Sequence, residues 1–84
     1  MAMIRFDYAA AAELFPSKST FKSARVGYRR FTTAAEAVRY AIEDMPAPLL
    51  RGSSLEVEEE RFDGFQIRGL YDAAAFPLVR VART

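Results

Sequence analysis

Hydrophobic and polar positions follow two different periods along this 84-residue chain. The clearest helical pattern covers residues 34–44, where apolar side chains recur every three or four positions. Thr33 precedes this run and Glu36 follows three residues later, a spacing typical of a capping box. Pro46 lies just beyond the run, and the residue before a proline is pushed out of the α region. The sequence therefore predicts an amphipathic helix over residues 34–44.

The first third of the chain predicts a helix, a loop and a strand. Over residues 7–15, Asp7 suits the N-cap position, apolar side chains recur at helical spacing, and Pro16 follows the run. We therefore expect a short helix over this stretch. Residues 26–31 are rich in aromatic and β-branched side chains, which indicates a strand. Between the two, residues 17–25 are polar and basic, and we expect them to form a mobile loop.

A second strand is predicted over residues 54–60, where Leu55 and Val57 alternate with glutamates. The connector before it, residues 46–52, contains two consecutive leucines and is too apolar to lie free of the core. Near the C-terminus, Phe76 and the proline that follows it interrupt the regular hydrophobic pattern.

Asp63 and the glycine after it fit two different structures. The pair is a strong type I′ hairpin signal, but a hairpin here would switch the apolar face of the sheet partway along the strands. As a helix start, Asp63 is the N-cap, Gln66 completes a capping box, and Phe62 packs against Ile67. We favour a helix over residues 64–73, with the hairpin left open as the alternative.

Together these elements predict a small α+β or α/β domain, a two-layer sandwich in the order α-β-α-β-α. A right-handed crossover through the 34–44 helix would make strands 26–31 and 54–60 parallel neighbours. Two strands make a poor sheet, so we expect a third strand from a terminal segment or from a second copy of the chain. Residues 78–81 are a candidate for this short edge strand.

The length suits a single domain over residues 1–84, with residues 1–5 and 82–84 expected to be disordered. No segment approaches the roughly 20 apolar residues that span a bilayer, and no secretory signal is visible at the N-terminus. We therefore expect a cytoplasmic protein without membrane contact. Ten of the 12 basic residues are arginine, which indicates a bacterial genome of high GC content.

Composition narrows the chemistry because the chain has neither cysteine nor histidine. Disulfides, thiolate nucleophiles, thiolate zinc sites and Ser-His triads are thereby excluded. We expect no enzyme activity, no catalytic residue, no cofactor and no metal.

The formal net charge is +1, but the charges are unevenly distributed. Residues 1–40 carry seven basic and three acidic side chains, whereas residues 41–84 carry five and eight. The basic side chains of the first half alternate with aromatic ones, which is a pattern that can bind phosphates and stack on bases. The alternative is a solvated loop and a strand whose arginines pair within the fold. The candidate basic surface consists of Lys18, Lys22, Arg25, Arg29 and Arg30.

Carboxylates concentrate in the second half, and alternation along the predicted strand would place several of them in one row. Clustered carboxylates can hold Mg²⁺ or Ca²⁺, although their spacing does not match an EF-hand. The alternative is a solvent-facing strand whose charges protect an edge. A further alternative is that the acidic and basic clusters form ion pairs with each other, either within one chain or between two copies of it. The candidate acidic surface consists of Glu56, Glu58, Glu60 and Asp63.

Two stretches carry a resemblance to known sequences. Residues 27–37 contain Gly-Tyr-Arg-Arg-Phe and Thr-Ala-Ala-Glu-Ala, and residues 55–72 contain Leu-Glu-Val, Arg-Phe-Asp-Gly and Leu-Tyr-Asp. In these residues the chain resembles a group of short uncharacterised bacterial proteins of unknown function. The resemblance implies no activity, cofactor or site residue.

The function we favour from the sequence is a small, non-enzymatic bacterial protein-interaction or regulatory module. Its partner would be an unknown protein, and the chain itself would be a monomer or a weak homo-oligomer. The alternative is a nucleic-acid-binding protein that uses the basic and aromatic segment 18–30.

Overall fold

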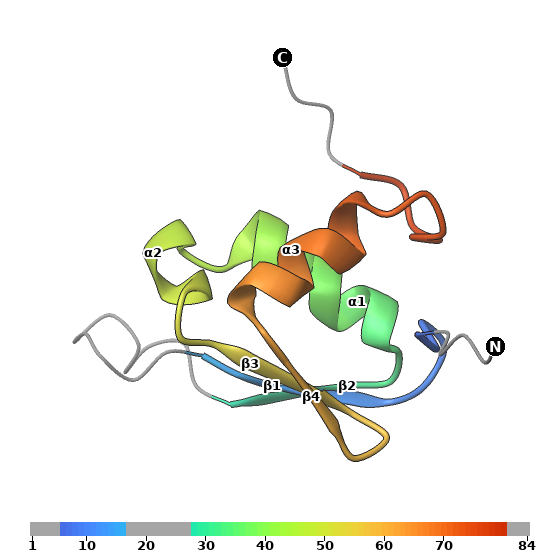
Figure 1. Cartoon of the computed structure of the whole chain (residues 1–84), viewed down its shortest axis with the longest axis horizontal. Helices are drawn as coiled ribbons and strands as arrows, with labels where there is room; N and C mark the ends of the chain where they lie inside the picture. The colour runs from blue at the N-terminus through green and yellow to red at the C-terminus, as the bar shows by residue number, and fades with distance from the viewer. Residues whose placement is uncertain (1–5, 17–27, 81–84) are drawn as a thin grey trace, which may run out of the picture.

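The structure is a computed structural model that describes residues 6–16 and 28–80. In these ranges it is a two-layer α+β fold, with helices on one side of a sheet (Figure 1). The sheet is antiparallel throughout and has the strand order β2-β1-β3-β4. Its strands are β1 (Ala12–Phe15), β2 (Arg29–Phe31), β3 (Ser54–Val57) and β4 (Glu60–Asp63). The helical layer contains α1 (Ala34–Arg39), a π-helical segment η2 (Tyr40–Asp44), α2 (Ala47–Leu50) and α3 (Gly64–Asp72).

The predicted helix over residues 7–15 is wrong, because this stretch is a turn followed by β1. The Asp7 side chain accepts a hydrogen bond from the Ala9 amide at 3.0 Å, which closes the turn. The carbonyls of Tyr8 and Ala10 accept from the first amides of α1, at 2.9 and 2.6 Å. These carbonyls satisfy amides that a helix leaves unpaired at its start. The segment therefore caps the start of α1 instead of forming a helix of its own.

The predicted order and the predicted parallel pair are also wrong, because the strands come first and β1 lies between β2 and β3. As a central strand, β1 buries Ala12 and Leu14 and is paired on both sides. An isolated helix of two turns is only marginally stable in water. Pairing on both sides therefore outweighs the helix propensity of the alanines. The missing strand comes from the stretch that was expected to be helical.

The predicted strand 54–60 is a hairpin. β3 ends at Val57, and Val57 pairs in register with Glu60, the first residue of β4. The two residues between them, Glu58 and Glu59, have φ angles of 52° and 69°. Positive φ at both positions is the signature of a type I′ turn, which favours asparagine and glycine. Two glutamates therefore gave no signal that the chain turns there.

The helix expected over residues 64–73 is confirmed as α3, and the hairpin alternative at Asp63 is wrong. The Asp63 carboxylate accepts from the Gln66 amide at 2.8 Å, and the Gln66 side chain accepts from the Asp63 amide at 2.9 Å. Gly64 lies against the end of α2. A Cβ at this position would lie 2.2 Å from the carbonyl oxygen of Leu50, so only glycine fits the junction.

The helix predicted over residues 34–44 is confirmed as α1 and η2. Thr33 caps it by accepting a hydrogen bond from the Glu36 amide at 3.3 Å. The Glu36 carboxylate accepts from the Thr32 hydroxyl instead of closing the predicted capping box. Met45 is extended, with φ −73° and ψ 143°, so the helix ends directly before Pro46 as predicted.

The core lies between the sheet and the helical layer. Leu49 is fully buried, which confirms that the connector of residues 46–52 joins the core. The largest fully buried side chains come from both layers: Leu14, Val38, Leu49, Leu55 and Ile67.

The chain beyond α3 folds back on the end of that helix. Arg80 donates to the carbonyls of Tyr71 at 2.8 Å and Ala73 at 2.6 Å. Residues 78–80 form no strand, so the edge strand expected over 78–81 is wrong in its described part. The expectations for residues 1–5, 17–25 and 82–84 fall outside the described residues. No described helix is long and apolar enough to cross a membrane.

Candidate functional site: the open face of the sheet

The register brings four charged residues into one row across the sheet, which we call the charge row. In strand order it runs from Arg30 to Glu13, Glu56 and Arg61. Successive side chains of a strand point to opposite faces, and the neighbours of Glu13 and Glu56 along β1 and β3 are buried toward the helices. The charge row therefore lies on the face away from the helical layer, which we call the open face. Among the described residues, no helix covers this face (Figure 1).

The two central members of the charge row are both carboxylates, since Glu13 pairs in register with Glu56. Like charges directly opposite each other destabilise a sheet. Each carboxylate has one compensating contact. Arg61 forms an ion pair with Glu56 at 3.3 Å, and the Tyr28 hydroxyl donates to Glu13 at 3.1 Å. Arg30 is the register partner of Glu13 on its other side.

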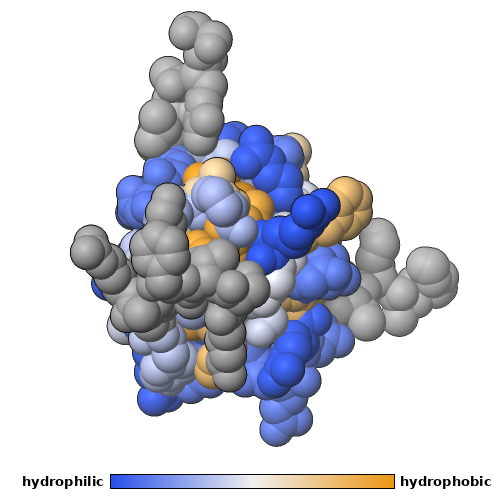
Figure 2. All heavy atoms as spheres, turned by 90° about the vertical axis from the view of Figure 1, so that its left-hand side faces the viewer, coloured by the Kyte–Doolittle hydropathy of each residue, from blue (hydrophilic) through white to orange (hydrophobic). Residues whose placement is uncertain are grey.

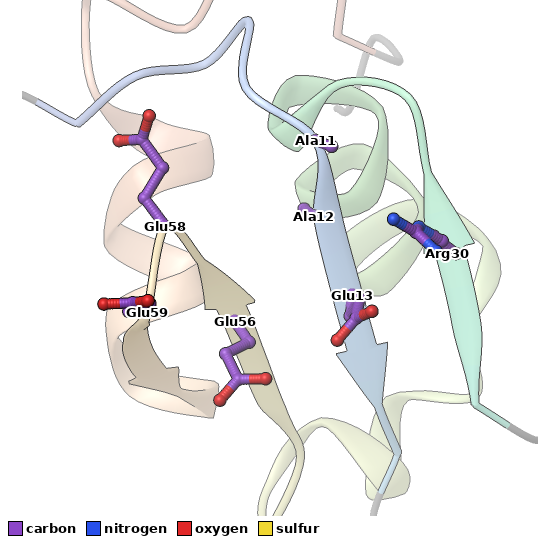
Figure 3. A pocket seen from close by; sticks show the side chains of 7 residues that line it. All are labelled: Ala11, Ala12, Glu13, Arg30, Glu56, Glu58 and Glu59. Carbon is purple, nitrogen blue, oxygen red and sulfur yellow. The ribbon is translucent and has the colours of Figure 1, made fainter.

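Next to the charge row the surface is hollowed, with a volume of about 290 Å³. Figure 3 shows Glu13 and Glu56 on neighbouring strands, the turn glutamates beyond β3, and Arg30 on the other side of β1. Four glutamates and one arginine line the hollow, so acidic residues outnumber basic ones around it. Its lining residues are Ala11, Ala12, Glu13, Arg30, Glu56, Glu58 and Glu59.

An aromatic pair borders the charge row. The rings of Tyr28 and Phe15 have centroids 5.1 Å apart, and Tyr28 is 53% exposed. Desolvation of the hydroxyl, then the hydrogen bond to Glu13 and the negative charge of that carboxylate, raise the pKa of Tyr28, while the positive charge of Arg30 opposes the rise. The hydroxyl therefore stays protonated as a donor to Glu13 at neutral pH.

The structure separates the residues of the predicted acidic surface, so the row expected along one strand is wrong. Glu56 belongs to the charge row and Glu58 to the turn. Glu60 lies on β4 opposite Val57, hence toward the helical side. Asp63 caps α3. The cause is the turn after Val57, which ends the alternation on which the row depended. No group of three or more described Asp or Glu side chains is arranged to hold a metal ion.

The predicted basic surface is described only in part, because Lys18, Lys22 and Arg25 lie outside the described residues. Arg29 and Arg30 are neighbours on β2 and point to opposite faces. The Arg29 guanidinium lies on the helical side, 4.7 Å from the ring centroid of Tyr40, in a cation–π contact. Arg30 lies on the open face, where its register partner is a glutamate. That glutamate is Glu13, from a segment predicted as helix.

Glu13 was not predicted as a member of the site, whereas Tyr28 lies within the basic and aromatic segment 18–30 that the sequence offered as a nucleic-acid-binding alternative. In the sequence, Ala12–Phe15 contains a single polar residue among apolar ones, and four residues are too few to distinguish a strand from a helix. Comparisons of the chain with protein-family models, curated proteins and solved structures find no match.

Proposed function

We propose that this protein is a small, non-enzymatic protein-interaction module whose open face binds a basic segment of a partner protein. The observation that carries the proposal is the acidic hollow, which four glutamates and one arginine line on a side of the sheet that no described helix covers. A lysine or arginine in this hollow would relieve the repulsion between Glu13 and Glu56. Charge-assisted hydrogen bonds to carboxylates are also the stronger class of hydrogen bond.

The aromatic pair beside the charge row supports a peptide segment as the ligand. Tyrosine and arginine are enriched in protein interfaces, where an aromatic ring supplies apolar contact and a hydroxyl supplies specificity. An arginine of the partner can pair with a carboxylate and stack on the exposed Tyr28 ring at the same time. We therefore favour an arginine-bearing segment over one that contains only lysine.

The composition supports a non-enzymatic role, because the chain has no histidine or cysteine to serve as base, nucleophile or soft metal ligand. The nucleic-acid-binding alternative over residues 18–30 stays a prediction. Arg30, one of the two basic residues of this segment that the structure describes, lines the acidic hollow, and carboxylates there would repel a phosphate backbone. This placement favours a basic protein segment over a nucleic acid at the open face.

The test is titration of the full chain with a synthetic arginine-rich octapeptide, followed by amide shifts in NMR spectra. A peptide with glutamate in place of arginine serves as the ligand control. We expect the shifts to concentrate on β1, β3 and the turn between β3 and β4, and the affinity to fall as salt is raised. The double variant Glu13→Gln/Glu56→Gln should weaken binding by about tenfold, which corresponds to roughly 1.4 kcal/mol.

The matched control is Asp44→Asn/Asp72→Asn, which removes the same charge from exposed positions in the helical layer. It should leave the affinity nearly unchanged. Equal weakening by the two double variants would mean that the peptide senses only net charge, and the open face would lose its assignment. Tighter binding of a single-stranded oligonucleotide, abolished by Arg30→Glu, would favour the nucleic-acid alternative instead.

A further inference from the structure

A second hollow, of about 430 Å³, lies in the helical layer between the end of α2 and the first turn of α3. Figure 2 looks at the end of the molecule where α2 lies, and small hydrophobic patches interrupt a mostly hydrophilic surface there. The residues around this hollow differ in kind from those of the open face, since they combine an aromatic ring with two guanidiniums. Three of them carry the argument: Arg51, Phe65 and Arg68.

Phe65 is 88% exposed, although it belongs to the helix that contributes Ile67 and Tyr71 to the core. It lies in the first turn of α3, where Asp63 and Gln66 already supply the cap. Neither burial nor capping therefore accounts for a phenyl ring at this position. Phenylalanine and arginine are both enriched in protein interfaces, and here they lie side by side around one hollow.

The two guanidiniums are available to a ligand. Arg51 is exposed and forms no hydrogen bond or ion pair within the described ranges 6–16 and 28–80. Arg68 pairs with Asp72 at 3.4 Å, with both side chains about half exposed. A surface pair of this kind contributes little stability and is readily exchanged for another carboxylate.

The floor of the hollow is held in place by close backbone contacts. Gly64 lies against the Leu50 carbonyl, and the same carbonyl accepts from the Ser53 amide at 3.0 Å. The Ser53 hydroxyl donates to the carbonyl of Leu49. Gly52 has a φ of 89°, which allows the chain to turn between Arg51 and these contacts. The ring and the guanidiniums are thus carried by a fixed junction, which lowers the ordering cost of binding.

We infer that Arg51, Phe65 and Arg68 form a docking site for an acidic segment of a second partner protein. An apolar side chain of that segment packs on Phe65, and flanking carboxylates pair with the two arginines. Arginine and aromatic residues are the side chains that most often dominate binding energy in interfaces. The site is independent of the open face and has the opposite charge preference. The module would thereby join a basic partner to an acidic one.

Charge favours an acidic peptide over a nucleic acid at this site. A nucleic acid needs a positive groove that follows several phosphates, whereas this hollow offers two guanidiniums. Asp63 lines the same hollow and Asp72 is the ion-pair partner of Arg68. Two arginines on either side of an exposed ring suit a short segment in which carboxylates flank an apolar side chain.

The test is titration of the full chain with a fluorescent peptide, acetyl-Asp-Glu-Leu-Asp-Phe-Glu-Asp-amide, monitored by anisotropy at low salt. Phe65→Ala should weaken binding at least about fivefold, and Arg51→Gln/Arg68→Gln at least about tenfold. Val79→Ala is the matched control for the phenyl ring, because Val79 is 87% exposed and lies outside the hollow. Arg39→Gln is the control for charge, because Arg39 lines neither hollow, and both controls should leave the affinity unchanged.

The variants lie at exposed or half-buried positions, and thermal melts should confirm that each is folded before its affinity is compared. Unchanged affinity in Phe65→Ala would overturn the inference, as would equal binding of a peptide with glycine in place of leucine and phenylalanine. If a twelve-nucleotide oligothymidylate binds more tightly than the acidic peptide, the site would be assigned to nucleic acid. A self-associated species in sedimentation that Phe65→Ala dissolves would assign it to a second copy of the chain. Retained peptide binding in Glu13→Gln/Glu56→Gln would separate this site from the open face.

Discussion

The chain changes direction tightly at both ends of β4. The residues at its end suit the backbone conformation that they adopt, whereas the residues at its beginning do not. At its end, Asp63 and Gly64 meet every demand of a helix start, with a reciprocal cap and a glycine where α2 leaves no room for a Cβ. At its beginning, Glu58 and Glu59 both adopt positive φ, which side chains other than glycine and asparagine rarely do. The first junction follows local preference. The second is imposed by the pairing of β3 with β4, and its carboxylates line the acidic hollow.

The largest expected effect tests the close approach at the helix start. Gly64→Ala should lower the free energy of unfolding by about 3 kcal/mol, because the added Cβ meets a backbone carbonyl that cannot rotate away. Urea denaturation measures the change. Gly69→Ala is the matched control, since nothing lies within 4 Å of its added Cβ. That variant should gain about 0.5–1 kcal/mol, and a gain in both would refute the close-approach argument.

The turn should respond in the opposite direction. Glu58→Asn/Glu59→Gly should raise the free energy of unfolding by about 1–2 kcal/mol, because both new residues accept positive φ. The same variant should bind the arginine-rich peptide more weakly. Glu58→Gln/Glu59→Gln separates the two effects, since it removes the charges and keeps the backbone cost. If this control raises the free energy of unfolding, the turn is destabilised by charge repulsion and not by its backbone conformation.

Removal of the cap is expected to have a smaller effect. Asp63→Ala should cost about 1 kcal/mol, the usual loss when an N-cap carboxylate is replaced by alanine. Asp63→Asn keeps an accepting oxygen and should retain most of the stability. Thermal unfolding of the three proteins, followed by circular dichroism, distinguishes these outcomes. Equal losses in both variants would indicate that the charge of Asp63 matters more than its hydrogen bond.

The contrast between the two junctions also explains how much could be predicted from sequence. α1 and α3 were found because their caps and breakers are local: Thr33, Pro46, Asp63 and Gln66 act within a few residues. β1 was missed because its four residues gain their stability from β2 and β3, which lie far along the chain. The turn was missed because two glutamates carry no turn signal. Of the candidate site, Glu56 and Arg30 were identified, whereas their relation through Glu13 depends on β1.

The smallest expected effect is the loss of stability at alkaline pH. It compares Tyr8 on the helical side of the sheet with Tyr28 on the open face. Burial raises the pKa of Tyr8, with Arg80 opposing, and its hydroxyl donates to the Leu70 carbonyl in α3 at 2.8 Å. A raised folded pKa means that the stability is present below pH 10 and is lost as the pH rises through the folded pKa. Tyr28 follows the same sign on the open face.

We therefore expect the melting temperature to be flat up to about pH 9 and to fall above pH 10. Tyr8→Phe should reduce that alkaline fall more than Tyr28→Phe, because Tyr28 is more exposed to water. Melts between pH 8 and 11.5, with tyrosinate absorbance recorded in parallel, measure both. A larger change in Tyr28→Phe would place the alkaline sensitivity on the open face.

β1 enters the sheet between strands that are distant in sequence. Its pairing joins Glu13 to Glu56, whereas β3 and β4 are joined by a two-residue turn. Hairpins of that kind form within about 1–10 μs, but contacts between distant segments first require closure of a long loop. We therefore expect the two carboxylates to meet later than the two strands of the hairpin. A ligand that holds both would bind the finished fold and no partly folded form, and would protect the whole domain against unfolding in proportion to its concentration.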